Sequence, residues 1–218
     1  FIYDDDYNNF QWLIEKNTQV KNKVIFFIIQ KVTNAKYDGK YSISEKLMRN
    51  LNSKIKSNQH EIGIHFSYET YNNANNALAE KNIFFSNEKI FQAKSRQHFL
   101  RWSSLITPRI LNSVGIQKDY TVGYADHVGF RSGTCTKYKL YDLENRCELD
   151  TYEIPLIAMD VSLFGETYMN LSCENEILEV LFLLEDECRH FGGTYSILWH
   201  NNQLNSITHR EIYEKIIK

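Results

Sequence analysis

Apolar segments typical of buried strands alternate with amphipathic helical segments along this chain, and that alternation most limits the folds available to it. The run VIFFIIQ (24–30) is almost wholly β-branched and aromatic, as in a strand buried on both faces. Further strands are predicted at EIGIHF (61–66), TVGYAD (121–126), YEIPLIAMD (152–160), TYSILWH (194–200) and the opening FIYD (1–4). The pattern predicts an α/β fold with a mostly parallel sheet or barrel, and the length suits a single domain over residues 1–218.

The helical segments carry clear end signals. Ser42-x-x-Glu45 is a capping box that precedes apolar residues on one face. The stretch 174–190 begins with acidic residues and stops before Gly192–Gly193, which suits the helix dipole and a C-cap. Thr208-x-x-Glu211 predicts the start of a terminal helix, whereas the asparagine-rich YNNANN (71–76) predicts polar turns.

Charge and composition exclude several classes of partner. The formal net charge is −2, which gives no electrostatic basis for binding nucleic acid or an anionic membrane. No apolar run approaches the ~20 residues that span a bilayer, and no signal-peptide pattern is present. The four cysteines lack CxxC spacing, which favours free thiols in a reducing compartment and a cytoplasmic location. Because Phe1 falls in a predicted strand, we expect a truncated N-terminus.

Titratable residues stand at the carboxyl end of every strand considered so far except the apolar run 24–30. In parallel α/β folds these ends meet on one side of the sheet, where ligands bind. Turn chemistry explains any one of these residues alone, because aspartate favours turns, but their recurrence predicts a shared site. The residues are Asp4–Asp6, His65, Asp126, Asp160 and His200.

Three short stretches add candidates for chemistry. GIHFSYET (63–70) places His65 and Glu69 four residues apart, and a neutral imidazole at a strand end is able to bind a metal. KSRQHFLRW (94–102) brings together Arg96, His98 and Arg101, although an ordinary charged helix start would look the same. SILWHNN (196–202) puts His200 beside Trp199, as a strand turning into a loop would also do.

Taken in order, these stretches resemble the polysaccharide deacetylase (NodB-homology) family. That family has a TFDDG-like motif, an HxxxH-type motif, an RxPY-like motif and a final LxH motif, matched here by IYDDD, HFSYE, RQHF and LWH. GIHFSY, SRQHFLRW, GYADHVGFRSGTC, IPLIAMDVSLF and LWHNN resemble more closely a divergent branch associated with surface-polysaccharide loci. The resemblance implies a distorted (β/α)7-type, NodB-like barrel and metal-dependent removal of N-acetyl groups from a carbohydrate.

The resemblance also implies roles for individual residues. Asp4 matches the aspartate that acts as general base, and Arg96 matches the arginine that orients this base. His200 matches the histidine that acts as general acid, and His65 matches the first metal-binding histidine.

Two departures from the main family bear on the metal ligands. Glu69 stands where the second metal histidine is expected, and His98 stands where the third motif has proline. Either residue is a possible third ligand, and we favour His98. The main family would use Asp5 as the acidic ligand, whereas the D-x-D pattern of the divergent branch indicates Asp6. The preferred set is Asp6, His65 and His98, which suits Zn²⁺ best among divalent metals.

Further residues are candidates for binding the substrate. Arg131 in GFRSGT is able to clamp a carboxylate or phosphate. Aromatic side chains at Tyr68, Tyr124 and Trp199 are suited to stacking on a sugar, although core packing explains them equally well. Glu69 is placed with this group, and Asp126 and Asp160 are candidates for orienting histidines or capping helices.

The resemblance therefore implies a metal-dependent carbohydrate N-deacetylase, with zinc as the expected cofactor. Two alternatives stay open at this point: a non-catalytic glycan-binding relative of the same fold, and a nucleotide-sugar transferase that uses the D-x-D pattern. The sequence leaves open which sugar is involved, whether it is polymeric, lipid-linked or nucleotide-linked, and the oligomeric state.

Overall fold

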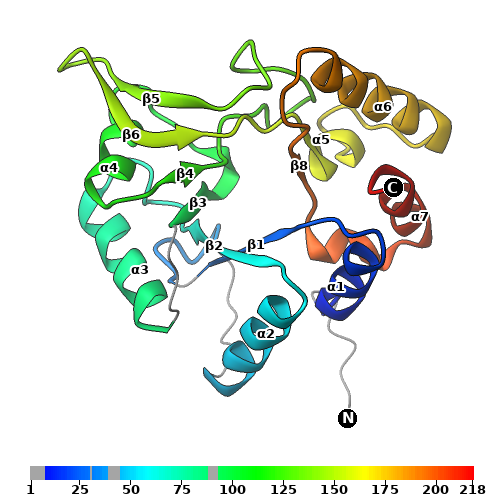
Figure 1. Ribbon diagram of the computed structural model, residues 1–218, viewed down its shortest axis with the longest axis horizontal. Helices are drawn as coiled ribbons and strands as arrows, with labels where there is room; N and C mark the ends of the chain where they lie inside the picture. The colour runs from blue at the N-terminus through cyan, green and yellow to red at the C-terminus, as the bar shows by residue number, and fades with distance from the viewer. Residues whose placement is uncertain (1–7, 30, 39–44, 88–92) are drawn as a thin grey trace.

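The structure is a computed structural model that describes residues 8–29, 31–38, 45–87 and 93–218. Its strands form a six-stranded sheet in the order β1-β2-β3-β4-β6-β5 and a separate two-stranded sheet, β7-β8 (Figure 1). All neighbours pair in parallel except β5 and β6. The bounds are β1 Ile25–Ile29, β2 Glu61–Phe66, β3 Lys94–Gln97, β4 Lys118–Asp119, β5 Tyr138–Asp142, β6 Cys147–Glu153, β7 Ala158–Met159 and β8 Ile197–Leu198.

The predicted mixed α/β class with a mainly parallel sheet is confirmed. In the described ranges the strands fall into two sheets, so the predicted closure into one barrel is not confirmed. The antiparallel hairpin β5–β6 was not predicted. Several of its buried positions carry polar side chains, among them Asp142, Thr151 and Glu153. The sequence therefore lacks the alternation of apolar and polar residues that marks a half-buried strand.

Two of the predicted strands need correction. The stretch 121–126 is not a strand: the Val122 amide donates to the Glu153 side chain (2.7 Å), and the Thr121 amide donates to the Asp119 side chain (3.1 Å). The predicted strand 152–160 is split between the end of β6 and β7. The Thr121 and Val122 amides are bound to side chains and cannot extend a ladder, so regular pairing stops after β4.

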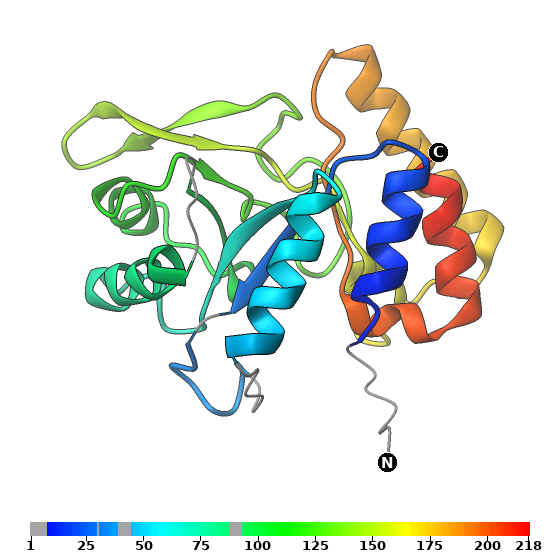
Figure 2. The ribbon, with the colours of Figure 1, turned by 60° about the horizontal axis from the view of Figure 1, so that its bottom comes forward.

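The helices connect the strands and lie around the outside of the two sheets (Figures 1 and 2). Their bounds are α1 Phe10–Gln19, α2 Glu45–Ser57, α3 Ala74–Asn87, α4 Thr107–Ser113, α5 Asp160–Phe164, α6 Glu174–His190 and α7 Ile207–Ile216, with 3-10 turns η1 His98–Leu100 and η2 Asn201–Asn205. No helix in these ranges is long and apolar enough to cross a membrane.

Helix 174–190 is confirmed, and two other predictions need correction. Helix α3 begins at Ala74, inside the stretch predicted as polar turns. Helix α7 begins at Ile207 rather than Thr208, because the Ser206 side chain accepts a hydrogen bond from the His209 amide and so caps the helix. Ser42 of the predicted capping box lies outside the described residues.

Two hydrophobic clusters form the main core. One packs beneath the six-stranded sheet and includes Ile64, Phe66 and Leu111, and the other packs among α5, α6 and α7 and includes Leu163 and Leu181. Trp199 and Ile217 pack against both clusters. Helices α1 and α7 lie side by side, as Figure 2 shows, through the Trp12 and Tyr213 rings. The four cysteines are free thiols, as predicted.

Candidate active site

Three histidines stand at or just beyond the carboxyl ends of three strands. His65 is the penultimate residue of β2, His98 follows β3, and His200 follows β8. All three line one cavity of about 1720 Å³, together with Arg96 and Asp38. The structure therefore brings together the three histidines that the sequence predicted for the site. They are at least 33 residues apart in the chain and lie at strand ends of both sheets.

Each histidine has its Nδ1 atom fixed by an oxygen acceptor. His65 Nδ1 lies 3.1 Å from the Arg96 carbonyl oxygen, and His98 Nδ1 lies 3.0 Å from Asp38 Oδ1. His200 Nδ1 lies 2.7 Å from Asp160 Oδ1. Carbonyl and carboxylate oxygens only accept, so Nδ1 carries the proton in each ring. In the neutral form Nε2 is then left as a lone-pair donor for a metal or a proton.

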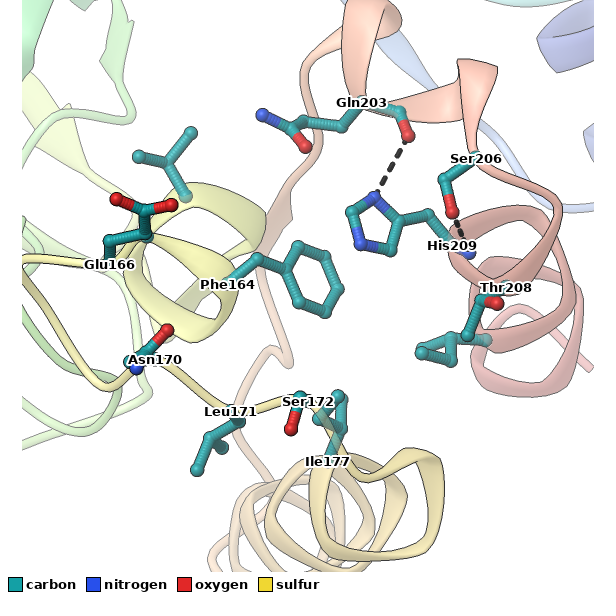
Figure 3. A pocket seen from close by; sticks show the side chains of 13 residues that line it. Phe164, Glu166, Asn170, Leu171, Ser172, Ile177, Gln203, Ser206, Thr208 and His209 are labelled. Atoms are coloured by element: carbon teal, nitrogen blue, oxygen red, sulfur yellow. Dashed lines mark hydrogen bonds between the residues drawn. The ribbon is translucent and has the colours of Figure 1, made fainter.

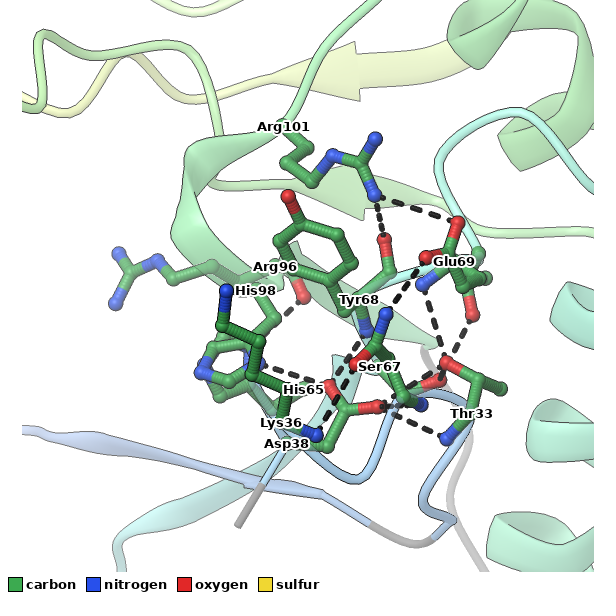
Figure 4. Close-up of polar contacts among 12 residues, drawn as sticks. Thr33, Lys36, Asp38, His65, Ser67, Tyr68, Glu69, Arg96, His98 and Arg101 are labelled. Atoms are coloured by element: carbon green, nitrogen blue, oxygen red, sulfur yellow. Dashed lines mark hydrogen bonds and ion pairs between the residues drawn. The ribbon is translucent and has the colours of Figure 1, made fainter.

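The carboxylate that holds His98 was not among the predicted residues. Asp38 is fully buried and accepts backbone hydrogen bonds from Thr33, Asn34 and Tyr68 at 2.9, 2.7 and 2.7 Å (Figure 4). Burial by itself raises the pKa of this carboxyl, but the hydrogen bonds from His98 and the three amides outweigh it and hold the pKa below its ordinary value. Asp38 is thus an ionised anchor for the His98 ring.

The Asp38 anchor continues into the protein as a chain of hydrogen bonds. Thr33 Oγ1 contacts both Asp38 Oδ2 (3.1 Å) and Ser67 Oγ (2.8 Å). Ser67 in turn donates through its amide (3.0 Å) and its hydroxyl to the buried Glu80 on α3. Thr70 also donates to Glu80, at 2.8 Å. The loops after β1 and β2 are therefore fixed relative to each other and to α3 beneath the histidines.

Burial makes two of the histidines poor bases. It lowers the pKa of His65 to about 3, and repulsion from His98 adds to this effect. Burial also lowers the pKa of His98, although Asp38 opposes the shift. Both rings are therefore neutral near pH 7, which is the form that binds metal ions.

The spacing of His65 and His98 fits a shared metal ion. Their ring centroids lie 5.0 Å apart. Two imidazoles bound through Nε2 at about 2.1 Å, with a near-tetrahedral angle, would place their centroids about 5 Å apart. No group of three histidine, cysteine, aspartate or glutamate side chains within the described ranges could by itself hold a metal. The predicted acidic residues Asp4, Asp5 and Asp6 lie outside those ranges.

Glu69 was the alternative third ligand. Its carboxylate accepts a hydrogen bond from the Asn34 side chain (3.0 Å) and lies 3.5 Å from Arg101 Nη1. Figure 4 shows this contact on the far side of Tyr68 from the His65 and His98 rings. The geometry ties Glu69 to Arg101, while His98 stands beside His65.

His200 is held by a second buried aspartate. Asp160, the first residue of α5, has no exposed side-chain surface and accepts from both His200 Nδ1 (2.7 Å) and the His200 amide (2.5 Å). About 40% of the His200 side chain is exposed. Asp160 therefore orients a histidine, as one reading of the sequence predicted, and leaves the reactive edge of the ring accessible.

Arg96 lies in the floor of the cavity. Its Nε donates to the Tyr120 carbonyl (2.9 Å), and its guanidinium lies over the Phe27 ring at 4.6 Å. A Cβ atom on Gly63 would lie 2.5 Å from that ring, so glycine is needed where Phe27 crosses β2. Burial lowers the pKa of Arg96 to about 10, which still leaves it charged near neutral pH.

A pair of buried carboxyl groups lies behind Arg96. Asp119 accepts from the Ser95 hydroxyl and the Thr121 amide, and Glu153 accepts from the Val122 amide. Burial raises the pKa of Asp119. Burial and the neighbouring Asp119 charge raise the pKa of Glu153 well above its ordinary value. Glu153 therefore holds its proton more tightly than an ordinary glutamate does.

Replacing Glu153 by glutamine is expected to raise the melting temperature at pH 8. An acid whose pKa is raised on folding binds more protons in the folded state than in the unfolded state above pH 4.5. The folded protein therefore loses stability as the pH rises. The glutamine amide mimics the neutral acid and removes that loss. Melting curves from pH 5 to pH 9 test this, with the exposed Glu148→Gln on the same strand as control. Equal pH slopes for Glu153→Gln and the wild type would contradict it.

Three of the remaining predicted residues, Arg131, Tyr124 and Asp126, do not line the cavity that holds the histidines. Arg131 donates to the Gly123 carbonyl (2.9 Å), and Tyr124 stacks on His127 at 3.8 Å. Asp126 is exposed and contacts only His127 among the interactions that the structure shows for it. Trp199 lines the cavity but also packs against both hydrophobic clusters. Tyr68 lies beside the Asp38 anchor, and its role is taken up below.

A smaller hollow of about 480 Å³ lies between α5 and the start of α7 (Figure 3). The Phe164 ring and the His209 imidazole stack there at 3.9 Å, and the His209 Nδ1 atom contacts the Gln203 carbonyl at 3.0 Å. None of the predicted site residues that the structure describes lines this hollow. The three site histidines and Arg96 line the larger cavity instead.

Comparisons with known proteins agree with this architecture. No family model and no curated protein matches the chain. Among solved structures, one described as a "putative polysaccharide deacetylase" from Mycobacterium smegmatis matches with a TM-score of 0.66 and 13% sequence identity. The match covers 97% of this chain and 70% of the mycobacterial chain. At this identity the likeness concerns the fold alone, and the chain has the fold of that protein.

Proposed function

We propose that the protein is a metal-dependent hydrolase that removes N-acetyl groups from a carbohydrate. The observation that carries the proposal is the convergence of three Nδ1-fixed histidines on one cavity, two of them neutral and 5.0 Å apart and the third held by Asp160. The fold shared with the mycobacterial protein supports the same class of reaction. Zinc is the proposed metal because two imidazoles and one carboxylate suit it.

The third proposed ligand, Asp6, and the proposed general base, Asp4, precede the described part of the chain. Asn9 Nδ2 donates to the Asn201 carbonyl at 2.9 Å, and Asn201 directly follows His200. Asn8, the first described residue, lines the cavity that holds the three histidines. These two contacts of the described chain support the proposed roles of Asp4 and Asp6.

In the proposed mechanism the chain holds groups in place and moves two protons. His65 and His98 would hold the metal, which would polarise the amide and lower the pKa of a water molecule. Asp4 takes the proton of the attacking water, and the Arg96 charge orients Asp4. His200 delivers a proton to the departing amine nitrogen, and Asp160 keeps the ring in the correct tautomer and orientation.

Acetate release from N-acetylated oligosaccharides tests the proposal. The chelated protein should be inactive, and adding back Zn²⁺ or Co²⁺ should restore acetate release and the matching loss of acetyl mass from the sugar. A chelated protein that retains full activity would contradict the metal requirement. Protein that binds the metal and the sugars but releases no acetate with any of them would contradict the reaction.

The second candidate is a glycan-binding relative without catalysis. The specific observation in its favour is that Glu69, at the family's second histidine position, is bound to Arg101 and Asn34 rather than placed beside His65. Saturable binding of sugars with no acetate release is the result expected for this candidate.

Replacing Asp38 by asparagine is expected to weaken metal binding about 10- to 100-fold, the usual effect of removing a carboxylate behind a ligating histidine. The asparagine NH₂ group would face donors, because Asp38 accepts hydrogen bonds at both oxygens. Calorimetric titration with Zn²⁺ measures the change. Asp126→Asn disrupts an Asp–His contact outside the cavity and is the matched control. Equal affinities of the Asp38 variant and the wild type would contradict the role of Asp38.

A further inference from the structure

Phe99 is an exposed aromatic residue in a strained backbone conformation directly beside His98. Its φ angle is +57°, and that of Leu100 is +50°. Bulky residues seldom adopt left-handed angles, so consecutive ones are an outlier that the surrounding structure must enforce. The strain does not bury the ring, because 56% of Phe99 stays exposed. Strain that keeps an apolar ring in solvent indicates a functional rather than a packing role.

The neighbours of Phe99 form a rigid aromatic support. Tyr37 and Tyr68 stack on each other at 4.2 Å, and each meets Phe99 at a near-perpendicular angle with centroids 5.6 Å apart. His98 contacts the Phe99 ring at 4.7 Å. The apolar surface of Phe99 is therefore continuous with the histidine that we propose as a metal ligand.

The support is fixed from below by the groups that fix the site. The Tyr68 amide donates to Asp38 (2.7 Å), and Arg101 donates to the Tyr68 carbonyl (2.7 Å). The Arg101 guanidinium lies between the Tyr68 and Tyr71 rings at 3.8 and 3.9 Å. The aromatic cluster is thus preorganised, which lowers the entropy lost when a ligand binds.

We propose that Phe99, supported by Tyr37 and Tyr68, is the stacking platform for the sugar ring whose N-acetyl group enters the cavity. This inference rests on the proposed function and assigns it a substrate-binding residue. The CH face of a pyranose is apolar, and it packs on an aromatic face while its hydroxyl groups remain in water or bind polar groups. Phe99 thereby holds the sugar beside His98 and contributes to specificity without taking part in the chemistry.

The surroundings of the ring favour a sugar over a protein partner. Arg101 borders the platform through its contact with the Tyr68 ring. Glu69 and Asn34 continue this polar border from Arg101, and the Glu69 side chain is 42% exposed. Planar carboxylate, amide and guanidinium groups around one or two aromatic rings match the alternation of CH faces and hydroxyl groups on a sugar.

The test compares ring variants by ligand-observed NMR and affinity measurements. The probes are oligosaccharides of N-acetylglucosamine, N-acetylgalactosamine and N-acetylmannosamine. Phe99→Ala and Phe99→Leu should weaken binding about tenfold or more and abolish the upfield ring-current shifts of the sugar CH protons, whereas Phe99→Trp should keep both. Phe99→Gly accepts a φ of +57° and provides a folded variant if alanine fails. Phe191→Ala is the control, because Phe191 is an exposed phenylalanine (68%) directly after α6 whose ring contacts His190 rather than a proposed site residue.

Each outcome decides the proposal. Selective loss of affinity and of ring-current shifts in the alanine and leucine variants, with unchanged Zn²⁺ affinity, supports it. Wild-type binding that is unaffected by these variants overturns the platform and leaves the proposed function standing. Failure of the wild type to bind any of the three sugars overturns both. Sugar binding through Phe99 without acetate release supports the platform and overturns only the reaction.

Discussion

Replacing Asp160 by asparagine is expected to lower kcat for acetate release by about 10²- to 10⁴-fold while leaving the folded structure and Zn²⁺ affinity largely unchanged. Asp160 accepts from His200 Nδ1 and from the His200 amide, and asparagine would turn one acceptor oxygen into a donor. The ring would then take the other tautomer or rotate, and Nε2 would no longer face the departing amine. The rate of acetate release as a function of pH is the measurement.

The pH profile separates catalysis from folding. A positioning role predicts loss or displacement of the limb that reports the proton donor, together with lower kcat and little change in KM. His200→Ala should be as inactive as the Asp160 variant, and the double variant should be no worse than either alone, because the two residues act as one unit. If the Asp160 variant keeps the wild-type kcat and pH profile, His200 is not the proton donor.

Alanine at His65 or at His98 is expected to reduce Zn²⁺ affinity by at least about 10³-fold. Two of the proposed ligands are these neutral imidazoles, and a metal held by one fewer ligand loses a large part of its binding free energy. Calorimetric titration and measurement of the metal content of the purified protein provide the values. Activity should fall in parallel and should not return at saturating substrate.

His209→Ala is the matched control for both metal variants. His209 also has its Nδ1 atom bound to a backbone carbonyl, but it stacks on Phe164 in the smaller hollow, outside the site. It should bind zinc like the wild type. Full zinc affinity in His65→Ala would show that this histidine is no ligand. Loss of zinc in His209→Ala would indicate that the metal binds in the smaller hollow beside Phe164.

The strands and helices that could be predicted from the sequence are those whose buried positions carry apolar side chains. The strand at 61–66 and the helix at 174–190 are such cases, because their buried faces are apolar and their ends carry turn or cap residues. Strand β3 was missed because its sequence, KSRQ, is wholly polar although all four residues are buried. Its side chains are paired instead: Lys94 contacts Glu61, Ser95 donates to Asp119, and Arg96 donates to the Tyr120 carbonyl.

The same reasoning separates the site residues that were found from those that were missed. Histidines at strand ends are rare enough in a sequence to be noticed, and the structure brings His65, His98 and His200 to one cavity. Asp38 stands in a short polar loop, TNAKYDG, that looks like any turn. Only the three amides that converge on Asp38 distinguish it, and those contacts depend on the fold. The proposed roles of Asp4 and Asp6 stay predictions.

The separation of the two sheets makes the rate sensitive to distant packing. His65 and His98 belong to the six-stranded sheet and His200 to the two-stranded one, and within the described ranges no backbone ladder joins these sheets. Trp199 directly precedes His200 and packs against both hydrophobic clusters, so we expect its packing to influence the distance between the proposed proton donor and the proposed metal ligands. Substitutions at Trp199 would change the distance from His200 to His65 and His98, and so would alter kcat although Trp199 itself does not react.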